Sequence, residues 1–200
     1  MPDLKASETA KNLMRAFAGE CQARARYTFA AELAKAQKMP MVEAVLQYTA
    51  NQEKEHAEIF YKYLEPLDKE TIVIDGGYPV DAEQNTLAQL RAAAHNEYEE
   101  HDVVYRSFGE IAEKEGFSQI AASFRMIAEI EKTHGDRFQY LADLLSQGDL
   151  FKGSKKTAWV CTNCGYICER EEAPQECPVC HHEQGYFARK ELAPWFLQEQ

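Results

Sequence analysis

The stretches EKEH at residues 53–56 and EKTH at residues 131–134 each place a glutamate three residues before a histidine. On a helix, side chains three residues apart lie on one face, so a carboxylate and an imidazole can reach a single point. Each stretch has a glutamate upstream: Glu20 lies 33 residues before Glu53, and Glu97 lies 34 residues before Glu131. The repeated pattern predicts a four-helix bundle that holds two metal ions.

Apolar residues recur at the three-four spacing of amphipathic helices through the first two thirds of the chain. Gly76, Gly77 and Pro79 interrupt this spacing in the stretch 66–80, which we therefore expect to be non-helical. Four helices are predicted, at about residues 7–37, from Pro40 onward, at 81–115 and at 118–147.

The two halves of this region resemble each other. Residues 50, 53, 56 and 60 recur in type at an offset of 78, whereas Glu20 and Glu97 differ by 77. This indicates a duplicated helical hairpin. A connection of roughly fifteen residues between the halves is long enough to cross the bundle, so the expected fold is mainly α: a ferritin-like four-helix bundle with one long crossover.

Composition limits the classes of partner. The chain is 45% hydrophobic and 28% charged, which is sufficient for a packed core. Its net charge of −11 argues against nucleic acid or an anionic membrane as a partner. No apolar run approaches the ~20 residues of a membrane span, and the first ten residues lack the apolar core of a signal peptide. We expect a soluble, cytoplasmic protein.

The glutamates and histidines of the two motifs fall where a helix facing a core would carry Leu or Phe. An isolated buried carboxylate is costly, so it must be paired, protonated or bound to metal. Two divalent ions would neutralise four carboxylates. The alternative is a hydrogen-bonded Glu–His pair or a solvated helix edge, but two copies with matched upstream glutamates favour the dimetal site. Tyr27 and Tyr105 are candidates to donate hydrogen bonds to its ligands, and the sequence leaves Glu100 open between ligand and surface residue.

Four cysteines form two close pairs, Cys161 with Cys164 and Cys177 with Cys180. Four thiolates in two C-x-x-C pairs suit one tetrahedral ion, and they leave zinc and iron as alternatives. Gly165 permits the positive φ of a tight turn after a ligand. The predicted domains are a ferritin-like bundle at 1–148, a linker at 149–156 and a small metal-binding β domain at 157–200.

These motifs together resemble the rubrerythrin family, a ferritin-like di-iron bundle followed by a rubredoxin-like domain, over essentially all 200 residues. The resemblance implies two iron ions in the bundle, with Glu53 and Glu131 bridging, and one iron ion on the four cysteines. It also implies that Glu100 and His56 exchange at one iron as the redox state changes. His181 departs from the family pattern, standing where rubredoxin often has Gly. The resemblance implies one set of residues as both the iron ligands and the catalytic residues of the di-iron site: Glu20, Glu53, His56, Glu97, Glu100, Glu131 and His134.

The implied activity is reduction of hydrogen peroxide to water, as protection against oxidative stress. The reduced iron pair would give two electrons to peroxide, and the thiolate-bound iron would return them singly. The resemblance implies an external NAD(P)H-dependent reductase or a rubredoxin as the electron donor.

Helix geometry adds an expectation about assembly. His134 lies about 14 residues before the fourth helix ends, which is ~20 Å at 1.5 Å per residue. We therefore expect a head-to-tail homodimer in which each four-cysteine site serves the other subunit's iron pair. Three alternatives remain: a ferroxidase or iron-storage protein, a zinc-ribbon interaction protein with a structural bundle, and an oxygenase.

Overall fold

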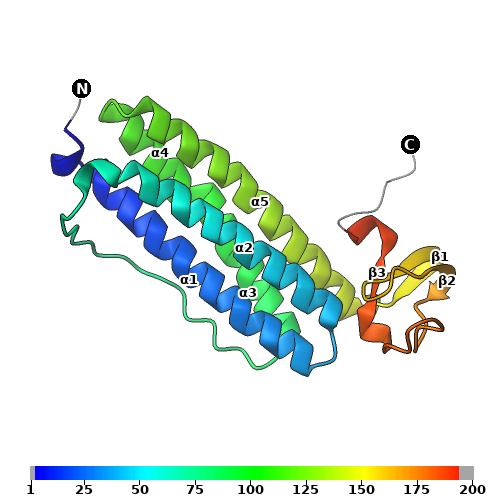
Figure 1. Cartoon of the computed structure of the whole chain (residues 1–200). Coiled ribbons are helices and arrows are strands. Elements are labelled where there is room, and N and C mark those ends of the chain that lie inside the picture. The colour runs from blue at the N-terminus through cyan, green and yellow to red at the C-terminus, as the bar shows by residue number, and fades with distance from the viewer. Residues whose placement is uncertain (1–2, 194–200) are drawn as a thin grey trace.

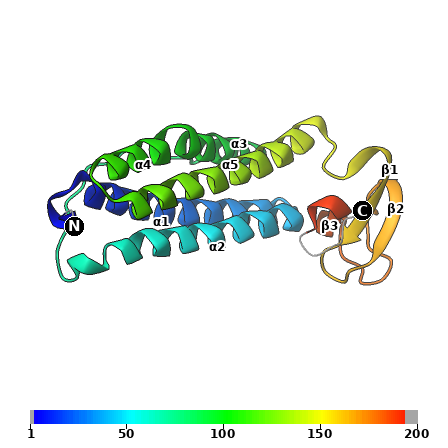
Figure 2. The same cartoon turned by 90° about the horizontal axis from the view of Figure 1, so that it is seen from above.

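A computed structural model describes residues 3–193 (Figure 1). Helices α1 and α2 form a hairpin, and α3, α4 and α5 pack beside it (Figures 1 and 2). All five helices lie along the long axis of the resulting bundle. A small sheet stands at one end. The bounds are α1 Glu8–Ala36, α2 Pro40–Tyr63, α3 Thr86–Glu99, α4 Tyr105–Lys114, α5 Ser118–Gln147, β1 Lys152–Cys161, β2 Ile167–Glu172 and β3 Phe187–Arg189.

The ends of these helices follow from local sequence signals. The Ser7 hydroxyl accepts a hydrogen bond from a backbone N–H in the first turn of α1, and Pro40 occupies the first position of α2. Gly148, with φ of 74°, ends α5 in the left-handed conformation. The expected bounds of α1 and α5 are therefore confirmed to within a residue.

The third predicted helix, 81–115, is wrong in two respects. It begins at Thr86 because the Asn85 side chain accepts a hydrogen bond from the first turn, and Asp81 instead pairs with Arg26 at 2.9 Å. It is also divided, since Glu100–Val104 form a π-helical turn between α3 and α4. Such turns insert one residue into a helix and change the direction in which side chains point.

Two apolar clusters fill the bundle, one on each side of its polar centre. Leu46 and Phe138 belong to the cluster nearer the α1–α2 turn, and Leu13, Phe60 and Phe124 belong to the other. The glutamates and histidines of the motifs lie between these clusters along each helix, so the apolar packing encloses them. Among the described residues, no helix combines the length and apolar character that a membrane span requires.

The C-terminal region forms a three-stranded antiparallel sheet in the order β2-β1-β3. Strand β1 begins at Lys152, inside the segment 149–156 expected to be a linker, and its pairing is irregular between Lys152 and Thr157. The domain boundaries stay a prediction, and the end of the expected domain 157–200 lies outside the described residues.

The sheet region packs on the end of the bundle near the α1–α2 turn (Figure 1). A Cβ built on Gly185 would collide with the Lys38 carbonyl oxygen and would lie 2.8 Å from the ring of Pro40. Lys38 also forms an ion pair with Glu183 at 3.3 Å, and Ala188 belongs to the adjoining apolar cluster of the bundle. The sheet region is thus packed closely against the bundle of the same chain.

Candidate metal centres

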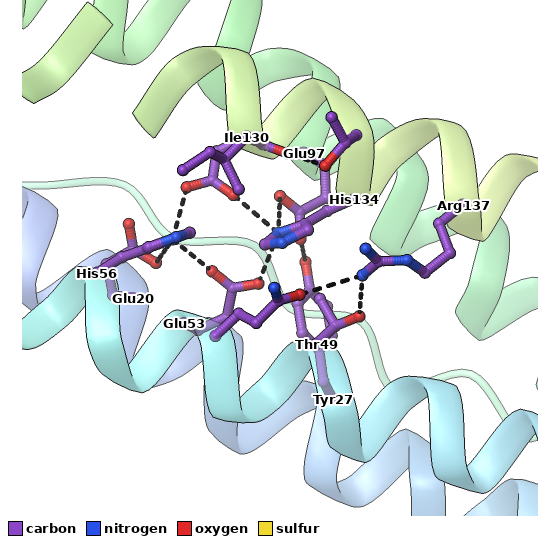
Figure 3. A network of polar contacts seen from close by, with 12 residues as sticks. Glu20, Tyr27, Thr49, Glu53, His56, Glu97, Ile130, His134 and Arg137 are labelled. Atoms are coloured by element: carbon purple, nitrogen blue, oxygen red, sulfur yellow. Dashed lines mark hydrogen bonds and ion pairs between the residues drawn. The ribbon is translucent and has the colours of Figure 1, made fainter. Parts of the chain in front are cut away.

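Two sets of side chains from four helices converge at the centre of the bundle (Figure 3). In each set the ligand atoms lie within 4.8 Å of one another, and every residue is buried. Glu53 and Glu131 belong to both sets, so each of these carboxylates faces both histidines. The sets are Glu20, Glu53, His56 and Glu131, and Glu53, Glu97, Glu131 and His134.

The two histidines occupy equivalent positions. His56 Nδ1 lies 2.9 Å from Glu131 and 3.2 Å from Glu53, and His134 Nδ1 lies 2.9 Å from Glu131 and 3.0 Å from Glu53. The imidazole rings are stacked, with their centroids 5.6 Å apart. Glu20 completes the set around His56 at 3.8 Å, and Glu97 completes the set around His134 at 3.7 Å. The site therefore has two halves that share a central pair of carboxylates.

These residues fit a pair of metal ions. Both side-chain oxygens of Glu53 and of Glu131, one oxygen of Glu20, one of Glu97 and Nδ1 of each histidine are buried without a hydrogen bond. Buried polar atoms normally have partners, so such a concentration of unpaired acceptors needs cations. Carboxylate oxygens and imidazole nitrogens are the donor set of dimetal carboxylate bundles.

The acid–base properties of the cluster show the same need for positive charge. Burial, followed by the Glu53 carboxylate, raises the pKa of Glu97 to about 8. Burial lowers the pKa of His134, but contacts with Glu131 and Glu53 outweigh it and raise that pKa to about 12. Burial raises the pKa of Glu53, yet close contacts with the His134 and His56 imidazoles bring it to about 2. Protons thus balance charge where metal ions fit, and ion binding would release them.

Tyr27 and Tyr105 donate hydrogen bonds to two ligand carboxylates, as the sequence predicted, but each holds the glutamate of a helix other than its own. The Tyr27 hydroxyl donates to Glu97 at 2.5 Å, and the Tyr105 hydroxyl donates to Glu20 at 2.6 Å. Burial, and then the neighbouring carboxylate, raises the pKa of both tyrosines well above its usual value, so both remain donors. Each hydroxyl fixes one oxygen and leaves the other free for a metal.

Glu100 occupies a different position from the other expected ligands. It lies on the π-helical turn, is partly buried and belongs to neither set of converging ligand atoms. Burial, and then the Glu97 carboxylate, raises the pKa of Glu100 well above its usual range. Glu100 is therefore close enough to interact electrostatically with the cluster, and its role as a ligand stays a prediction.

Sequence reasoning missed Arg137 at the edge of the site (Figure 3). Its guanidinium donates to Thr49 at 2.8 Å and to Gln52 at 3.3 Å, and lies 5.4 Å from the ring of Tyr48. The spacing contained a signal, since Arg137 stands three residues after His134 and so shares its helix face. Cys21, the chain neighbour of Glu20, is exposed.

The second centre consists of the four cysteines of the sheet region. Cys161 Sγ lies 3.7 Å from Cys180 Sγ, and Cys164 Sγ lies 3.6 Å from Cys177 Sγ. A disulfide would require about 2.05 Å. Four sulfurs at about 2.3 Å from one tetrahedral ion would lie roughly 3.8 Å apart. All four ligand atoms fall within 4.8 Å of one another, so the set fits one ion.

Two equivalent turns build this centre. Gly165 has φ of 78° and donates its N–H to the Cys161 carbonyl at 2.8 Å. His181 has φ of 60° and donates its N–H to the Cys177 carbonyl at 2.9 Å. The positive φ predicted at Gly165 is observed, and His181 adopts the same conformation although glycine would do so with less strain.

Comparison with known proteins covers both centres. The family model described as Rubrerythrin matches residues 11–142, and the one described as Rubrerythrin, rubredoxin-like domain matches residues 159–188. A rubrerythrin from Clostridium perfringens is 45% identical over 94% of this chain and 96% of its own. One from Nitratidesulfovibrio vulgaris is 39% identical over 94% of this chain and 96% of its own.

The fold agrees with that of a solved relative. A structure of nigerythrin in a mixed-valence state has a TM-score of 0.60 with 23% identity, covering 92% of this chain and 90% of the nigerythrin chain. The two family matches, the identity of the relatives and the two constellations of metal-binding side chains agree. The chain belongs to the rubrerythrin family, with a di-iron bundle and a rubredoxin-like domain.

Proposed function

We propose that this protein reduces hydrogen peroxide to water at the di-iron site, as protection against oxidative stress in the cytoplasm. Membership of the family makes the chain an oxidoreductase. The proposal rests chiefly on one observation: a buried two-histidine, four-glutamate cluster and a four-thiolate centre occur in one chain. The glutamate–histidine cluster suits a pair of metal ions that together supply two electrons, and the four-thiolate centre suits a single ion that transfers one electron at a time.

The proposed ligands of the iron pair are Glu20, Glu53, His56, Glu97, Glu100, Glu131 and His134. Conversion of one peroxide to two waters consumes two electrons and two protons. Two ferrous ions would supply the electrons and a positively charged place for peroxide to bind. Tyr27 and Tyr105 hold Glu97 and Glu20 in position. The second helical hairpin of the bundle, unlike the first, carries an extra glutamate, Glu100, which we propose exchanges with His56 at one iron as the redox state changes.

The appended centre separates this function from its rival. An iron-storage protein or ferroxidase would use the same bundle but has no need of a built-in one-electron centre. We propose that Cys161, Cys164, Cys177 and Cys180 hold an iron ion that passes electrons from an external rubredoxin or NAD(P)H-dependent reductase to the di-iron site.

Stopped-flow absorbance of the anaerobic, iron-loaded and fully reduced protein tests this function. Mixing with hydrogen peroxide should oxidise both kinds of iron centre rapidly, while dioxygen should act much more slowly. Slow oxidation by peroxide combined with fast consumption of dioxygen would instead indicate a ferroxidase.

We further propose that electrons pass between subunits of a head-to-tail homodimer. Helix α5 ends 13 residues after His134, or about 20 Å at 1.5 Å per residue. The rubredoxin-like region packs beyond that end, by the α1–α2 turn (Figure 1). Its thiolates therefore lie far from the di-iron site of the same chain, and a second copy arranged in the opposite direction would bring the two kinds of centre together.

A heterodimer of two disabled subunits tests this arrangement. One subunit carries Glu53→Ala with Glu131→Ala and keeps its four cysteines, and the other carries Cys161→Ser with Cys164→Ser and keeps its di-iron site. Neither homodimer should turn over with reductase and peroxide. The doubly tagged heterodimer should regain one working pair of centres. An inactive heterodimer whose intact centres are both loaded with iron would contradict electron transfer between subunits.

A further inference from the structure

The crossover between α2 and α3 is attached to the bundle at two points. Arg15 on α1 donates to the Asp75 backbone carbonyl at 2.9 Å and to the Asp75 carboxylate at 2.7 Å. Arg26, about three turns further along α1, pairs with Asp81 at 2.9 Å, and Asn96 of α3 donates to Asp81 at 2.7 Å. The segment between these attachments therefore has a fixed course across the bundle surface, although it contains neither helix nor strand.

The segment covers a cavity of about 280 Å³. Gly76, Gly77, Tyr78 and Pro79 form its outer wall. The Tyr78 hydroxyl donates to the Arg15 backbone carbonyl at 3.0 Å, which holds the ring across the cavity. A Cβ built on Gly19 would lie 3.8 Å from that ring, so the absence of a side chain at Gly19 leaves the space beneath Tyr78 open.

The inner wall of this cavity reaches the di-iron site. It includes Glu100 and Tyr105, and Tyr105 donates directly to Glu20. The apolar clusters enclose the site from both ends of the bundle, whereas this side is hollow. A water molecule takes up about 30 Å³ of liquid. The cavity therefore has room for a small oxidant together with several waters beside Glu100.

The charges around the cavity favour an uncharged molecule. Glu99 and Glu100 line it, while Arg15, the one cation among the described residues of its wall, is already paired with Glu8 and Asp75. A small anion would approach carboxylates with no free cation to attract it. Hydrogen peroxide is small, neutral and able to donate and accept hydrogen bonds.

Building on the peroxidase function proposed above, we propose that this cavity is the approach by which small neutral peroxides reach the di-iron site, and that Tyr78 sets the size of peroxide admitted. The crossover then has a role besides connecting the two halves of the bundle. A hydroperoxide that carries a phenyl group would have to displace the Tyr78 ring, whereas hydrogen peroxide would not.

The first test measures access without turnover. Nitric oxide is small and neutral, and its association with the diferrous protein can be followed by stopped-flow absorbance. Gly19→Leu places a side chain under Tyr78 and should slow association about tenfold, since a blocked approach acts on the rate of binding. Tyr78→Ala should not slow it. Tyr140→Ala is the control, because Tyr140 is as exposed as Tyr78, at 42% against 39%, but lies on α5 away from the cavity.

The second test measures selectivity by comparing oxidation of the diferrous protein by hydrogen peroxide and by cumene hydroperoxide. Tyr78→Ala should raise the rate ratio of cumene hydroperoxide to hydrogen peroxide about tenfold, the scale on which steric fit discriminates substrates. Tyr140→Ala should leave the ratio unchanged. Should Gly19→Leu fail to fold, Ser107→Leu fills the cavity from another wall.

The outcomes separate this inference from the proposed function. The inference would be overturned if Gly19→Leu left the association rate of nitric oxide unchanged, or if Tyr78→Ala left the selectivity ratio unchanged. If the reduced wild-type protein does not react with any peroxide but the filled variant still slows nitric oxide, the peroxidase function fails while the approach route is upheld.

Discussion

At the scale of single residues, the di-iron site depends on two tyrosine hydroxyl groups that are not themselves metal ligands. Glu20 and Glu97 each present one oxygen toward the cluster and have the other held by a tyrosine. Without that hydroxyl, a second oxygen would be buried without a partner. The orientation of the Glu20 and Glu97 carboxylates is therefore fixed by tyrosines that do not bind metal.

Tyr105→Phe removes the hydroxyl that holds Glu20 while keeping the ring. We expect the affinity of the site for Co²⁺, measured by competition with a chelator in the metal-free protein, to fall by about 10- to 100-fold, the usual effect of losing a partner that orients a ligand. Tyr63→Phe is the matched control, because its hydroxyl contacts Ser123 at 2.8 Å and no metal ligand. Equal affinities in the two variants would contradict the role of Tyr105.

At the scale of elements, α1 begins against a carboxylate from the turn between α4 and α5. Glu115, the residue after α4, accepts hydrogen bonds from the backbone N–H of Glu8 at 3.0 Å and of Thr9 at 2.8 Å. Burial raises the pKa of Glu115, but the hydrogen bonds from Thr9 and Glu8 outweigh it and lower the pKa overall. A carboxylate at a helix N-terminus satisfies otherwise unpaired donors and complements the helix dipole.

Glu115→Gln should lower the free energy of unfolding by about 1 kcal/mol at pH 7. Because the folded pKa is depressed, the stabilisation is present above the unfolded pKa near 4.5 and is lost as pH falls through the folded value. Urea denaturation of the metal-free protein should therefore show a smaller difference at pH 3. Glu110→Gln, which removes an exposed charge paired only with Lys114 at 3.9 Å, should show little effect at either pH.

At the scale of the whole molecule, the rubredoxin-like region is positioned by a contact that tolerates no side chain. Gly185 abuts the backbone of the α1–α2 turn at Lys38 and the ring of Pro40. These are rigid neighbours, so an added side chain cannot be accommodated by a rotamer change. The placement of the four-cysteine centre relative to the bundle thus depends on this glycine.

Gly185→Val should separate the region from the end of the bundle without unfolding either. Small-angle scattering should show an increased radius of gyration, and limited proteolysis should cut faster within residues 149–156. Gly77→Val provides the control, since a Cβ there meets no atom within 4 Å. An unchanged scattering profile would show that other contacts suffice to seat the region.

Much of this architecture could be predicted from the sequence because its signals are local. The caps and stripes of α1 and α5, the two Glu-x-x-His motifs and the cysteine pairs all depend on spacing within one element. The start of α3 had a local signal in the N-cap residue Asn85, whereas the pairing of Asp81 with Arg26, from a distant part of the chain, had none. The cavity beneath Tyr78 could not be predicted from the sequence either, since it depends on the course of a segment without hydrophobic periodicity.

The π-helical turn had a signal that was not interpreted. Glu20 and Glu97 are 77 residues apart, whereas Tyr27 and Tyr105, which play equivalent parts, are 78 apart. One additional residue must therefore lie between Glu97 and Tyr105, and the π-helical turn Glu100–Val104 accommodates it.

The same counting has a consequence for stoichiometric metal uptake. With the 77-residue offset, the counterpart of Glu100 in the first half is Ala23, a small apolar residue. The pseudo-twofold symmetry of the bundle is thus broken by one acid, and the two ion positions have different surroundings although their nearest ligands match. In a chain whose four-cysteine centre is disabled by Cys161→Ser with Cys164→Ser, titration of the metal-free bundle with a single kind of divalent ion should accordingly give a biphasic isotherm, with one ion bound at each step.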